Sequence, residues 1–596
     1  MTDGIYRKSI PLSEYFRYEI VPFEPGTTVI PKGTVWKKGR KPLECDIIYM
    51  RDVAIKMRDG ITLYADIFRP DTEEKVPVIL NSTHYGKAIR DIAKPYGVDA
   101  DQAEIYSAPG VKRADTSGLE THEGSDPGFW CAHGYAVVNL DERGCFNSEG
   151  NAYYLGPLNG LDNYDAIEWL AAQDWSNGKV TMTGNSWLAV AQWFAAAACP
   201  PHLACIAPWE GTSDFYRDEW MQGGIPNTPG FRFANTCKDG GMCEDMTANM
   251  LYHPLLDEYW QDRIPKVEDS HIPVYATASW SSRIHTRGTW RAWRAFGTDK
   301  KWIRVHALQE WADFYDPENQ KDLLRFFDFY MKGIDNGWES TPKIRLSVLD
   351  PGGVDETNRV VESFPLPDQQ LKELYLDASD MGLAWEKPQS EGSVSYCSCD
   401  NKGMVKFTHT FEEETEIIGY ISAKLWVEAE GHNDLDLLVK VSKVDKDGNY
   451  LWHYPLPGNH SYIKGVGYSG PFGLQRASLR KLDPEKSTPN EPYHTFDTVE
   501  KLMPHEIVPV EVAIYPTSLR FHKGEKLEFS VAGYLYFPFP RCEHPVDLNH
   551  DGNLMFTCKP MNKPFTRTLI DNNGNHIIYT GGKYDSKLII PVIPMK

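Results

Sequence analysis

The chain has 596 residues, too many for one hydrophobic core, and this length predicts roughly three to four domain-sized units. Hydrophobic residues make up 41% and charged residues 24%, as in ordinary folded proteins, and the formal net charge is −21. A negative field of this size repels phosphate backbones and anionic lipid, so nucleic acid and membrane surfaces are poor partners.

Neither a membrane span nor a secretory signal is visible in the sequence. No stretch reaches the roughly 18 uninterrupted apolar residues of a span, and the first residues lack an apolar leader segment. The eleven cysteines show no zinc-knuckle spacing, so we expect no metal, no other cofactor, and reduced, mostly buried thiols. These features favour a cytoplasmic protein, present as a single chain or as a homo-oligomer.

The first half of the chain has the pattern of an α/β fold. Residues 1–45 are rich in proline, glycine and aromatic residues and predict an N-terminal arm laid over a domain surface. Two segments with period-two alternation, 46–57 and 62–69, then predict a hairpin. Short apolar runs suit parallel strands buried on both faces, and helical patterns between them predict helices on both sides of a mostly parallel sheet. The runs are 76–81, 136–140, 180–184, 271–276 and 301–306, and the helical patterns include 163–172 and 187–199.

Two further segments break this rhythm. Residues 212–268 are rich in glycine, methionine and aromatic residues and predict a helical cap, inserted so that residues 46–211 and 269–345 form the α/β domain. From residue 346 to 596, strand-like segments are separated by Gly, Asp and Asn turns without a long helix. This pattern predicts a C-terminal all-β domain of the jelly-roll type.

The most informative stretch for chemistry surrounds Ser186. A β-rich run stops at Gly184, and an alanine-rich helix begins after Ser186. This is the strand–turn–helix context of a nucleophile elbow, in which the glycine allows the tight turn and the helix N-terminus favours a developing oxyanion. The second glycine of such elbows is missing, because Leu188 stands in its place. We expect Ser186 to be a nucleophile; the alternative is a serine that caps the helix.

A serine hydroxyl needs a base, and an acyl-transfer site needs an oxyanion hole. His306 ends the run 301–306 and stands where the histidine of an α/β-hydrolase is expected; His285, on the preceding loop, is the alternative. One oxyanion donor should be the backbone N–H of Trp187, directly after the nucleophile. The second should come from the loop after residues 76–80, where Tyr85 presents a phenolic donor unless it is merely a packed aromatic.

The chain resembles the cocaine esterase-like (CocE/NonD) hydrolases, relatives of X-Pro dipeptidyl-peptidase, glutaryl acylase and the α-amino acid ester hydrolases. The resemblance implies an α/β-hydrolase domain, a helical cap and a C-terminal jelly roll. It also implies that Ser186 and His306 are nucleophile and base, and that Tyr85 and the Trp187 amide form the oxyanion hole. The segments that carry it are Met57–Pro70, Thr83–Lys87, Asp141–Gly150, Gly184–Trp187, Arg325–Gly337, Arg476–Pro484 and Tyr579–Gly582.

The chain departs from this family at the acid of the triad. In such enzymes an aspartate follows a Gly-Trp-Tyr-like turn on the loop before the histidine strand, but here Ser282 occupies that place. Glu310 is the first candidate for a replacement because it shares a loop with His306; Asp214 and Asp313 are the others.

Together these features predict a serine hydrolase that cleaves an ester or amide of a small organic acyl substrate through an acyl-enzyme on Ser186. The missing aspartate keeps an alternative open. That alternative is a non-hydrolytic protein of the same fold, an acyltransferase, lyase or isomerase with a degenerate triad.

Overall fold

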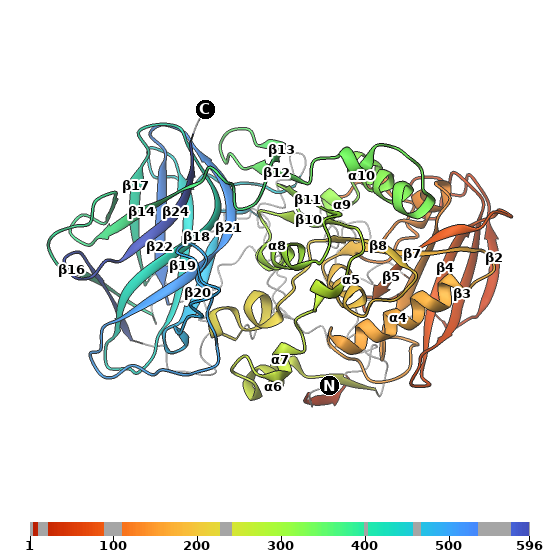
Figure 1. Ribbon diagram of the computed structural model, residues 1–596, viewed down its shortest axis with the longest axis horizontal. Coiled ribbons are helices and arrows are strands. Elements are labelled where there is room, and N and C mark those ends of the chain that lie inside the picture. The colour runs from red at the N-terminus through yellow and green to blue at the C-terminus, as the bar shows by residue number, and fades with distance from the viewer. Residues whose placement is uncertain are drawn as a thin grey trace.

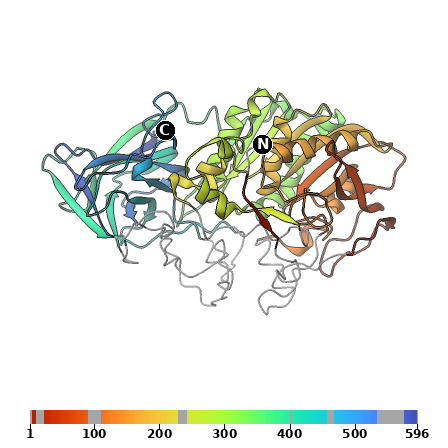
Figure 2. The same ribbon diagram turned by 90° about the horizontal axis from the view of Figure 1, so that it is seen from below.

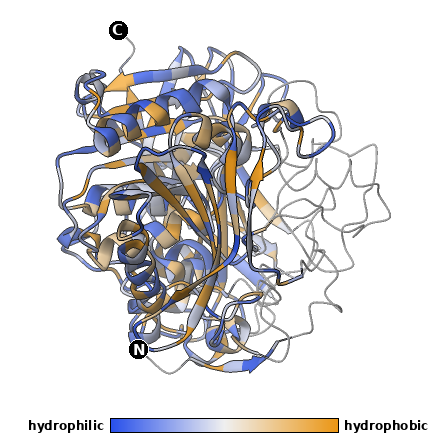
Figure 3. Ribbon diagram, turned by 90° about the vertical axis from the view of Figure 1, so that its right-hand side faces the viewer, coloured by the Kyte–Doolittle hydropathy of each residue, from blue (hydrophilic) through white to orange (hydrophobic). Residues whose placement is uncertain are grey.

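A computed structural model shows two sheets of eleven strands each, one inside an α/β domain and one inside an all-β domain (Figure 1). It describes residues 4–9, 22–88, 110–226, 241–398, 403–456, 467–533 and 574–594. Hydrophobic residues concentrate in the central strands, and the outer faces of helices and loops are largely hydrophilic (Figure 3). The predicted class, an α/β-hydrolase fold followed by an all-β domain, is confirmed.

The first sheet has the strand order β13-β12-β11-β10-β8-β7-β5-β6-β4-β3-β2. Every pairing from β6 through β5, β7, β8, β10 and β11 to β12 is parallel, and the strands at both ends of the sheet pair antiparallel. The strands are β2 (Gly26–Ile30), β3 (Ile47–Lys56), β4 (Thr62–Pro70), β5 (Val76–Thr83), β6 (Ala136–Asp141), β7 (Ser176–Asn185), β8 (Leu203–Trp209), β10 (Val274–Ser279), β11 (Lys301–His306), β12 (Ile344–Val348) and β13 (Glu356–Val361).

Helices cover both faces of this sheet, which explains the continuous apolar runs. Along β10, Val274 and Ala276 join the hydrophobic cluster beneath α4, α5 and α8, whereas Tyr275 joins the cluster beneath α3 and α10. Both faces of each central strand are therefore buried, and the alternation of polar residues disappears. The helices are α3 (Pro127–Ala132), α4 (Pro157–Ala171), α5 (Trp187–Ala197), α8 (Thr286–Ala295), α9 (Glu310–Phe314) and α10 (Pro317–Phe327).

The cap and the N-terminal arm pair with one another. Within the cap lie the helical turns η2 (Tyr216–Trp220) and η3 (Gln222–Gly224), strand β9 (Met242–Glu244), and the helices α6 (Met246–Tyr252) and α7 (Glu258–Gln261). Strand β1 of the arm (Tyr6–Lys8) pairs antiparallel with β9 (Figure 2). The arm thus contributes two short strands, β1 against the cap and β2 at the edge of the first sheet.

The second sheet begins with β14 and has the order β16-β23-β18-β24-β14-β15-β17-β22-β19-β20, with β21 paired to β18. Its long central strands carry the apolar residues of the β-domain core. The strands are β14 (Gln370–Asp377), β15 (Gly382–Ala384), β16 (Gly392–Cys397), β17 (Met404–Thr410), β18 (Thr415–Ala429), β19 (Asp436–Val444), β20 (Phe472–Arg476), β21 (Val508–Phe521), β22 (Lys526–Ala532), β23 (Asn575–Thr580) and β24 (Lys587–Ile593). The first sheet continues through β12 and β13, beyond residue 346, the residue at which the sequence predicts the all-β domain to begin.

The β domain packs directly on the cap and on α8. Gln222 donates a hydrogen bond of 2.8 Å to the Tyr515 hydroxyl, and Arg217 donates one of 2.9 Å to the main-chain oxygen of His494. Arg294 of α8 forms an ion pair of 2.9 Å with Glu491 of the β domain. The cap is therefore held between the two sheets.

Among the described residues, no helix is long and apolar enough to cross a membrane. Six cysteines in this part of the chain are free, and four of them are buried: Cys131, Cys145, Cys205 and Cys243. Cys397 is disulfide-bonded, in contrast to the expectation of reduced thiols.

Gly223 offers a test of the packing between the cap and the β domain. It has a φ of +62°, and a Cβ there would lie 2.0 Å from the main-chain oxygen of Leu474. Gly178 has a φ of +85° with nothing within 4 Å of a Cβ, so Gly178→Ala isolates the cost of the backbone conformation, about 1–2 kcal/mol. We expect Gly223→Ala to lower the free energy of unfolding by on the order of 4 kcal/mol. Its unfolding temperature should therefore fall much further than that of Gly178→Ala. Equal falls for the two variants would contradict the packing described here.

Candidate active site

Ser186 lies at the apex of a sharp turn between β7 and α5. Its φ of 51° and ψ of −112° are a strained conformation for a residue with a side chain, and its main-chain N–H donates to Trp209 (3.0 Å). Gly184 has a φ of +134°, and a Cβ there would lie 2.8 Å from Leu188 and 2.9 Å from the main-chain oxygen of Glu123. The turn therefore requires glycine at 184, as the sequence predicted.

A glycine in the loop after the neighbouring strand β8 compensates for the missing second glycine of the elbow. Leu188 and Ala189 fill the first turn of α5, and Gly211, after β8, would place a Cβ 2.9 Å from the Cβ of Ala189. Close approach of helix and sheet at the elbow thus relies on Gly211 rather than on a glycine at 188.

His285 is the histidine beside Ser186. The Ser186 Oγ and the His285 Nε2 are 3.3 Å apart, and His285 is only 5% exposed. His285 lies on the loop after β10, directly before α8, and Ser282 accepts a hydrogen bond of 3.2 Å from its main-chain N–H. The serine that stands at the expected aspartate position therefore orients the loop that carries the histidine.

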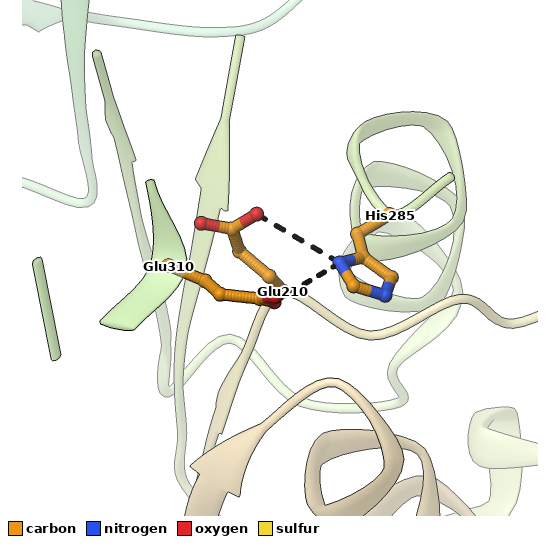
Figure 4. A group of neighbouring side chains, drawn as sticks. All are labelled: Glu210, His285 and Glu310. Carbon is orange, nitrogen blue, oxygen red and sulfur yellow. Dashed lines mark ion pairs between the residues drawn. The ribbon is translucent and has the colours of Figure 1, made fainter. Parts of the chain in front are cut away.

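Two buried carboxylates face the other ring nitrogen of His285 (Figure 4). The His285 Nδ1 is 3.3 Å from Oε2 of Glu310 and 3.8 Å from Oε2 of Glu210. Glu310 begins α9, and Glu210 directly follows β8 with a φ of 53°, which is a strained conformation. Ser186, His285 and the carboxylate pair form one continuous chain of polar groups at the carboxyl ends of the parallel strands.

The carboxylate pair changes the protonation of the imidazole. Burial disfavours the charged ring, but hydrogen bonds to Glu210 and Glu310, together with their charges, more than offset burial and raise the pKa of His285 to about 10. Burial also raises the pKa of Glu310, although its contact with His285 acts in the opposite direction. Burial also tends to raise the pKa of Glu210, but the contacts and charges of His306 and His285 outweigh burial and hold this pKa below its usual range.

His306, which the sequence predicts as the base for Ser186, does not contact Ser186 in the structure. Its Nε2 lies 2.9 Å from Oε1 of Glu210 and its Nδ1 lies 3.5 Å from Oδ1 of Asp313, whereas His285 is the histidine at Ser186. The reason is topological: β11 is separated from β7 by β10 and β8, and His306 is the last residue of β11, without a loop to carry it across. Glu310, four residues further along the chain, lies beyond the end of β11 and reaches His285.

The other two acid candidates are engaged elsewhere. Arg304 donates a hydrogen bond of 2.9 Å to Asp313, and Trp209 donates another of 2.9 Å to the same carboxylate. Asp214 accepts a hydrogen bond of 2.7 Å from Arg217 within the cap. Of the three predicted acids, the structure brings only Glu310 to a histidine that contacts Ser186.

Of the two expected oxyanion donors, Trp187 belongs to the elbow itself and Tyr85 lies on the loop after β5. Trp187 is the first residue of α5, so its N–H belongs to the helix N-terminus, and its indole donates to Glu142 at 2.8 and 2.9 Å. Tyr85 lies near the buried carboxyl group of Glu123, where it acts against the burial that raises the pKa of Glu123. The loop of Tyr85 is anchored by Lys87, whose Nζ lies 2.7 Å from the buried carboxylate of Asp52.

Sequence reasoning missed Glu210 and Glu123. Glu210 is the first residue after the strand next to the nucleophile strand, and the carboxyl ends of such strands are where functional side chains of α/β sheets gather. That signal was available for Glu210. Glu123 lies in an irregular segment between a 3-10 turn (Arg113–Asp115) and α3, and no pattern in the sequence points to it.

A divalent cation is the competing occupant of this cluster. One donor atom from each of Glu210, His285 and Glu310 lies within 4.8 Å of the others. Nδ1 of His285 faces both carboxylates, and a metal bound there would have to displace the proton of that nitrogen. Nε2 of the same ring contacts the nucleophile, so the cluster fits a histidine–acid pair better than a metal site.

This combination of a mixed α/β sheet, a nucleophile elbow and a Ser–His–carboxylate chain defines a serine hydrolase of the α/β-hydrolase class. Two family profiles match the chain: X-Pro dipeptidyl-peptidase (S15 family) at residues 59–240, and the X-Pro dipeptidyl-peptidase C-terminal non-catalytic domain at residues 336–589. A solved CocE/NonD family hydrolase from Staphylococcus aureus is 33% identical, with a TM-score of 0.83 over 98% of this chain and 100% of that one. The chain belongs to the CocE/NonD hydrolase family, and it is an enzyme that acts on ester or amide bonds.

Two curated relatives extend this comparison. Cocaine esterase from Rhodococcus sp. (strain MB1 Bresler) is 33% identical over 396 residues, which cover 55% of this chain and 62% of that protein, less than two thirds of its length. An Xaa-Pro dipeptidyl-peptidase from Streptococcus thermophilus is 20% identical over 582 residues, covering 81% of this chain and 74% of that protein. One relative cleaves esters by its name and the other peptides, so the family alone does not select the substrate.

The two histidines can be separated by mutation. We expect His285→Ala to lower kcat by about four to six powers of ten, because Ser186 loses the imidazole that accepts its proton. His306→Ala should cost far less, since it acts only through Glu210. Steady-state turnover of an aryl ester measures both, with unfolding temperature as the control for folding. A larger loss in His306→Ala than in His285→Ala would contradict the geometry.

Proposed function

We propose that this hydrolase cleaves an ester or amide of a small organic acyl substrate through an acyl-enzyme on Ser186. The observation that carries the proposal is the contact of His285 with Ser186 through Nε2 and with Glu310 through Nδ1 (Figure 4). This is the arrangement in which an imidazole takes a proton from serine while a carboxylate stabilises the resulting charge. Negative charge at the site and a net charge of −21 also favour a small molecule over nucleic acid or a membrane as the partner.

In the first step, Ser186 Oγ attacks the carbonyl carbon while His285 Nε2 accepts its proton. The tetrahedral oxyanion is held by the Trp187 N–H and the Tyr85 hydroxyl. His285 then returns the proton to the leaving alcohol or amine, and the acyl group stays on Ser186 as an ester. Water, deprotonated by the same imidazole, releases the acid and restores the serine.

The chain order of the proposed triad is Ser186, His285, Glu310. The usual order in this fold is serine, acid, histidine. Here the imidazole comes from the loop after β10 and the carboxylate from the loop after β11, so acid and base have exchanged loops. Because a triad is defined by geometry and not by sequence position, the exchange leaves the chemistry intact.

Two finer assignments are also proposals. A cytoplasmic location is supported by the six free cysteines among the described residues, and the disulfide at Cys397 argues against it. A jelly-roll topology of the β domain is supported by its antiparallel pairing, which runs through all but one of its strand contacts.

Covalent labelling tests the nucleophile. A fluorophosphonate should modify the parent protein at one site and leave Ser186→Ala unlabelled, and that variant should lose several powers of ten in ester turnover while remaining folded. A chelator such as EDTA should leave the parental rate unchanged, because the proposed chemistry uses no metal. Turnover by Ser186→Ala within tenfold of the parent would overturn the proposal, and loss of activity with EDTA would favour a metal at the cluster.

The pH dependence of activity tests the acid. His285 must be neutral to accept the serine proton, so kcat/KM should rise with pH through the raised pKa of His285, above neutrality. In Glu310→Gln one of the two carboxylates that hold the imidazolium is lost. The rising limb should move down by about one to three pH units, and the plateau kcat should fall by up to about four powers of ten.

Asp313→Asn serves as the comparison, because Asp313 contacts His306 and not His285. In this variant the rise of kcat/KM with pH should occur at the same pH as in the parent. A Glu310→Gln profile that is unchanged in position and height would show that Glu310 is not the acid, and the same shift in Glu210→Gln alone would transfer the role to Glu210.

A further inference from the structure

Helix α8 carries the proposed base at its N-terminus. His285 directly precedes the helix, and its carbonyl oxygen accepts a hydrogen bond of 2.8 Å from the N–H of Thr289. A shift or rotation of α8 would therefore move the imidazole, whose Nε2 lies 3.3 Å from the Ser186 Oγ. The contacts that hold α8 in place thus determine whether the base meets the nucleophile.

The loop after β8 packs tightly on α8. The Gly211 N–H donates a hydrogen bond of 3.2 Å to the Thr289 hydroxyl, which in turn donates one of 3.0 Å to the Gly211 carbonyl oxygen. Ser213 donates a hydrogen bond of 2.8 Å to the carbonyl oxygen of Gly288. A Cβ at Gly288 would lie 2.7 Å from the main-chain nitrogen of Ser213 and 2.8 Å from Oδ2 of Asp218. Loop and helix are therefore so close that only glycine fits at position 288.

Asp218 is the charged group in this contact. It lies in the helical turn η2 of the cap and is completely buried. Arg287 donates a hydrogen bond of 2.9 Å to its Oδ1, and Arg291 donates one of 2.6 Å to its Oδ2. Thr212 donates a further hydrogen bond of 3.2 Å to Oδ2. Because residues four apart lie on the same face of a helix, this single carboxylate holds two successive turns of α8.

The main chain of Asp218 is fixed independently of its side chain. Its N–H donates a hydrogen bond of 2.8 Å to the carbonyl oxygen of Asp214. Its own carbonyl oxygen accepts one of 3.0 Å from the hydroxyl of Tyr515 in β21. The ring of Tyr515 also faces the guanidinium of Arg287, 4.6 Å from the ring centroid. The cap and the β domain together therefore present the carboxylate to α8.

We propose that Asp218 is a positioning residue for the base: through Arg287 and Arg291 it fixes α8 so that His285 stays within reach of Ser186. No proton is transferred to or from Asp218 in this role. A misplacement of about 1 Å at a reacting group can cost on the order of a hundredfold in rate, so a small movement of α8 is sufficient. The inference rests on the proposed acyl transfer at Ser186.

Two substitutions of Asp218 test the contacts with the arginines. Asp218→Asn keeps the size and one acceptor oxygen and should lower kcat about three- to tenfold, whereas Asp218→Ala removes both acceptors and should lower kcat about a hundredfold. KM should stay within about threefold, because the loss arises in the chemical step. Steady-state turnover of an aryl ester, well below the unfolding temperature of each variant, measures both constants.

Gly288→Ala provides an independent variant if Asp218→Ala does not fold. Alanine is ordinarily favoured over glycine inside a helix, but here its Cβ would push α8 away from the loop after β8. This variant should also lower kcat more than it changes KM. A parental kcat in both Asp218→Asn and Gly288→Ala would contradict the inference.

Asp436 of β19 offers a matched control. It is also completely buried, and its carboxylate accepts hydrogen bonds of 2.8 and 3.0 Å from Arg476 within the β domain. Asp436→Ala should lower the unfolding temperature, because a buried arginine loses its carboxylate, but should leave kcat within about twofold of the parent. A fall of kcat as large as that of Asp218→Ala would show that the loss of any buried ion pair slows this enzyme, and would overturn the inference.

A double-mutant cycle shows whether Asp218 acts through the base. In the His285→Ala background, Asp218→Ala should cause no further loss of kcat, because the group that it positions is gone. Additive losses would overturn the inference, and so would a parental kcat in Asp218→Ala. Failure of the proposed function is distinguishable, since it would appear as turnover by Ser186→Ala.

Discussion

The active site depends on one interaction, the placement of the His285 imidazole between the hydroxyl of Ser186 and a pair of buried carboxylates. Nε2 lies 3.3 Å from the serine, and Nδ1 faces Glu310 and Glu210 at 3.3 and 3.8 Å. An imidazolium buried in this way would be costly alone, but two carboxylates compensate it. His306 in turn contacts Glu210, so the buried charges form a connected network rather than isolated pairs.

The fold maintains this network at a cost in backbone strain. Ser186, Glu210 and Glu123 all have positive φ values although none is a glycine; Ser186 is the apex of the nucleophile elbow, and the other two adjoin it. Each is held by a main-chain hydrogen bond: Ser186 to Trp209, Glu210 to Thr277, and Glu123 to Asn185. The parallel strands provide the rigid support, because their carboxyl ends bring loops that are far apart in sequence to one edge of the sheet.

The sequence was sufficient for the fold class and for the nucleophile, and it was insufficient for the base. Continuous apolar runs identified the central strands, and Gly184 before Ser186 identified the elbow, because both patterns are local. The choice between His285 and His306 depends on the order of strands in the sheet and on loop reach, neither of which a local pattern encodes. Glu310 is predicted because it lies close to His306 in sequence, yet in the structure it reaches the site from α9 and contacts His285 instead.

The most direct test of this account is a crystal structure of the protein after phosphonylation of Ser186 by a fluorophosphonate. The account predicts that one phosphonyl oxygen lies within hydrogen-bond distance of the Trp187 N–H and the Tyr85 hydroxyl. It also predicts that His285 remains between the phosphonylated serine and Glu310, with His306 still on Glu210. A structure in which His306 contacts the modified serine, or in which His285 has turned away from Glu310, would contradict it.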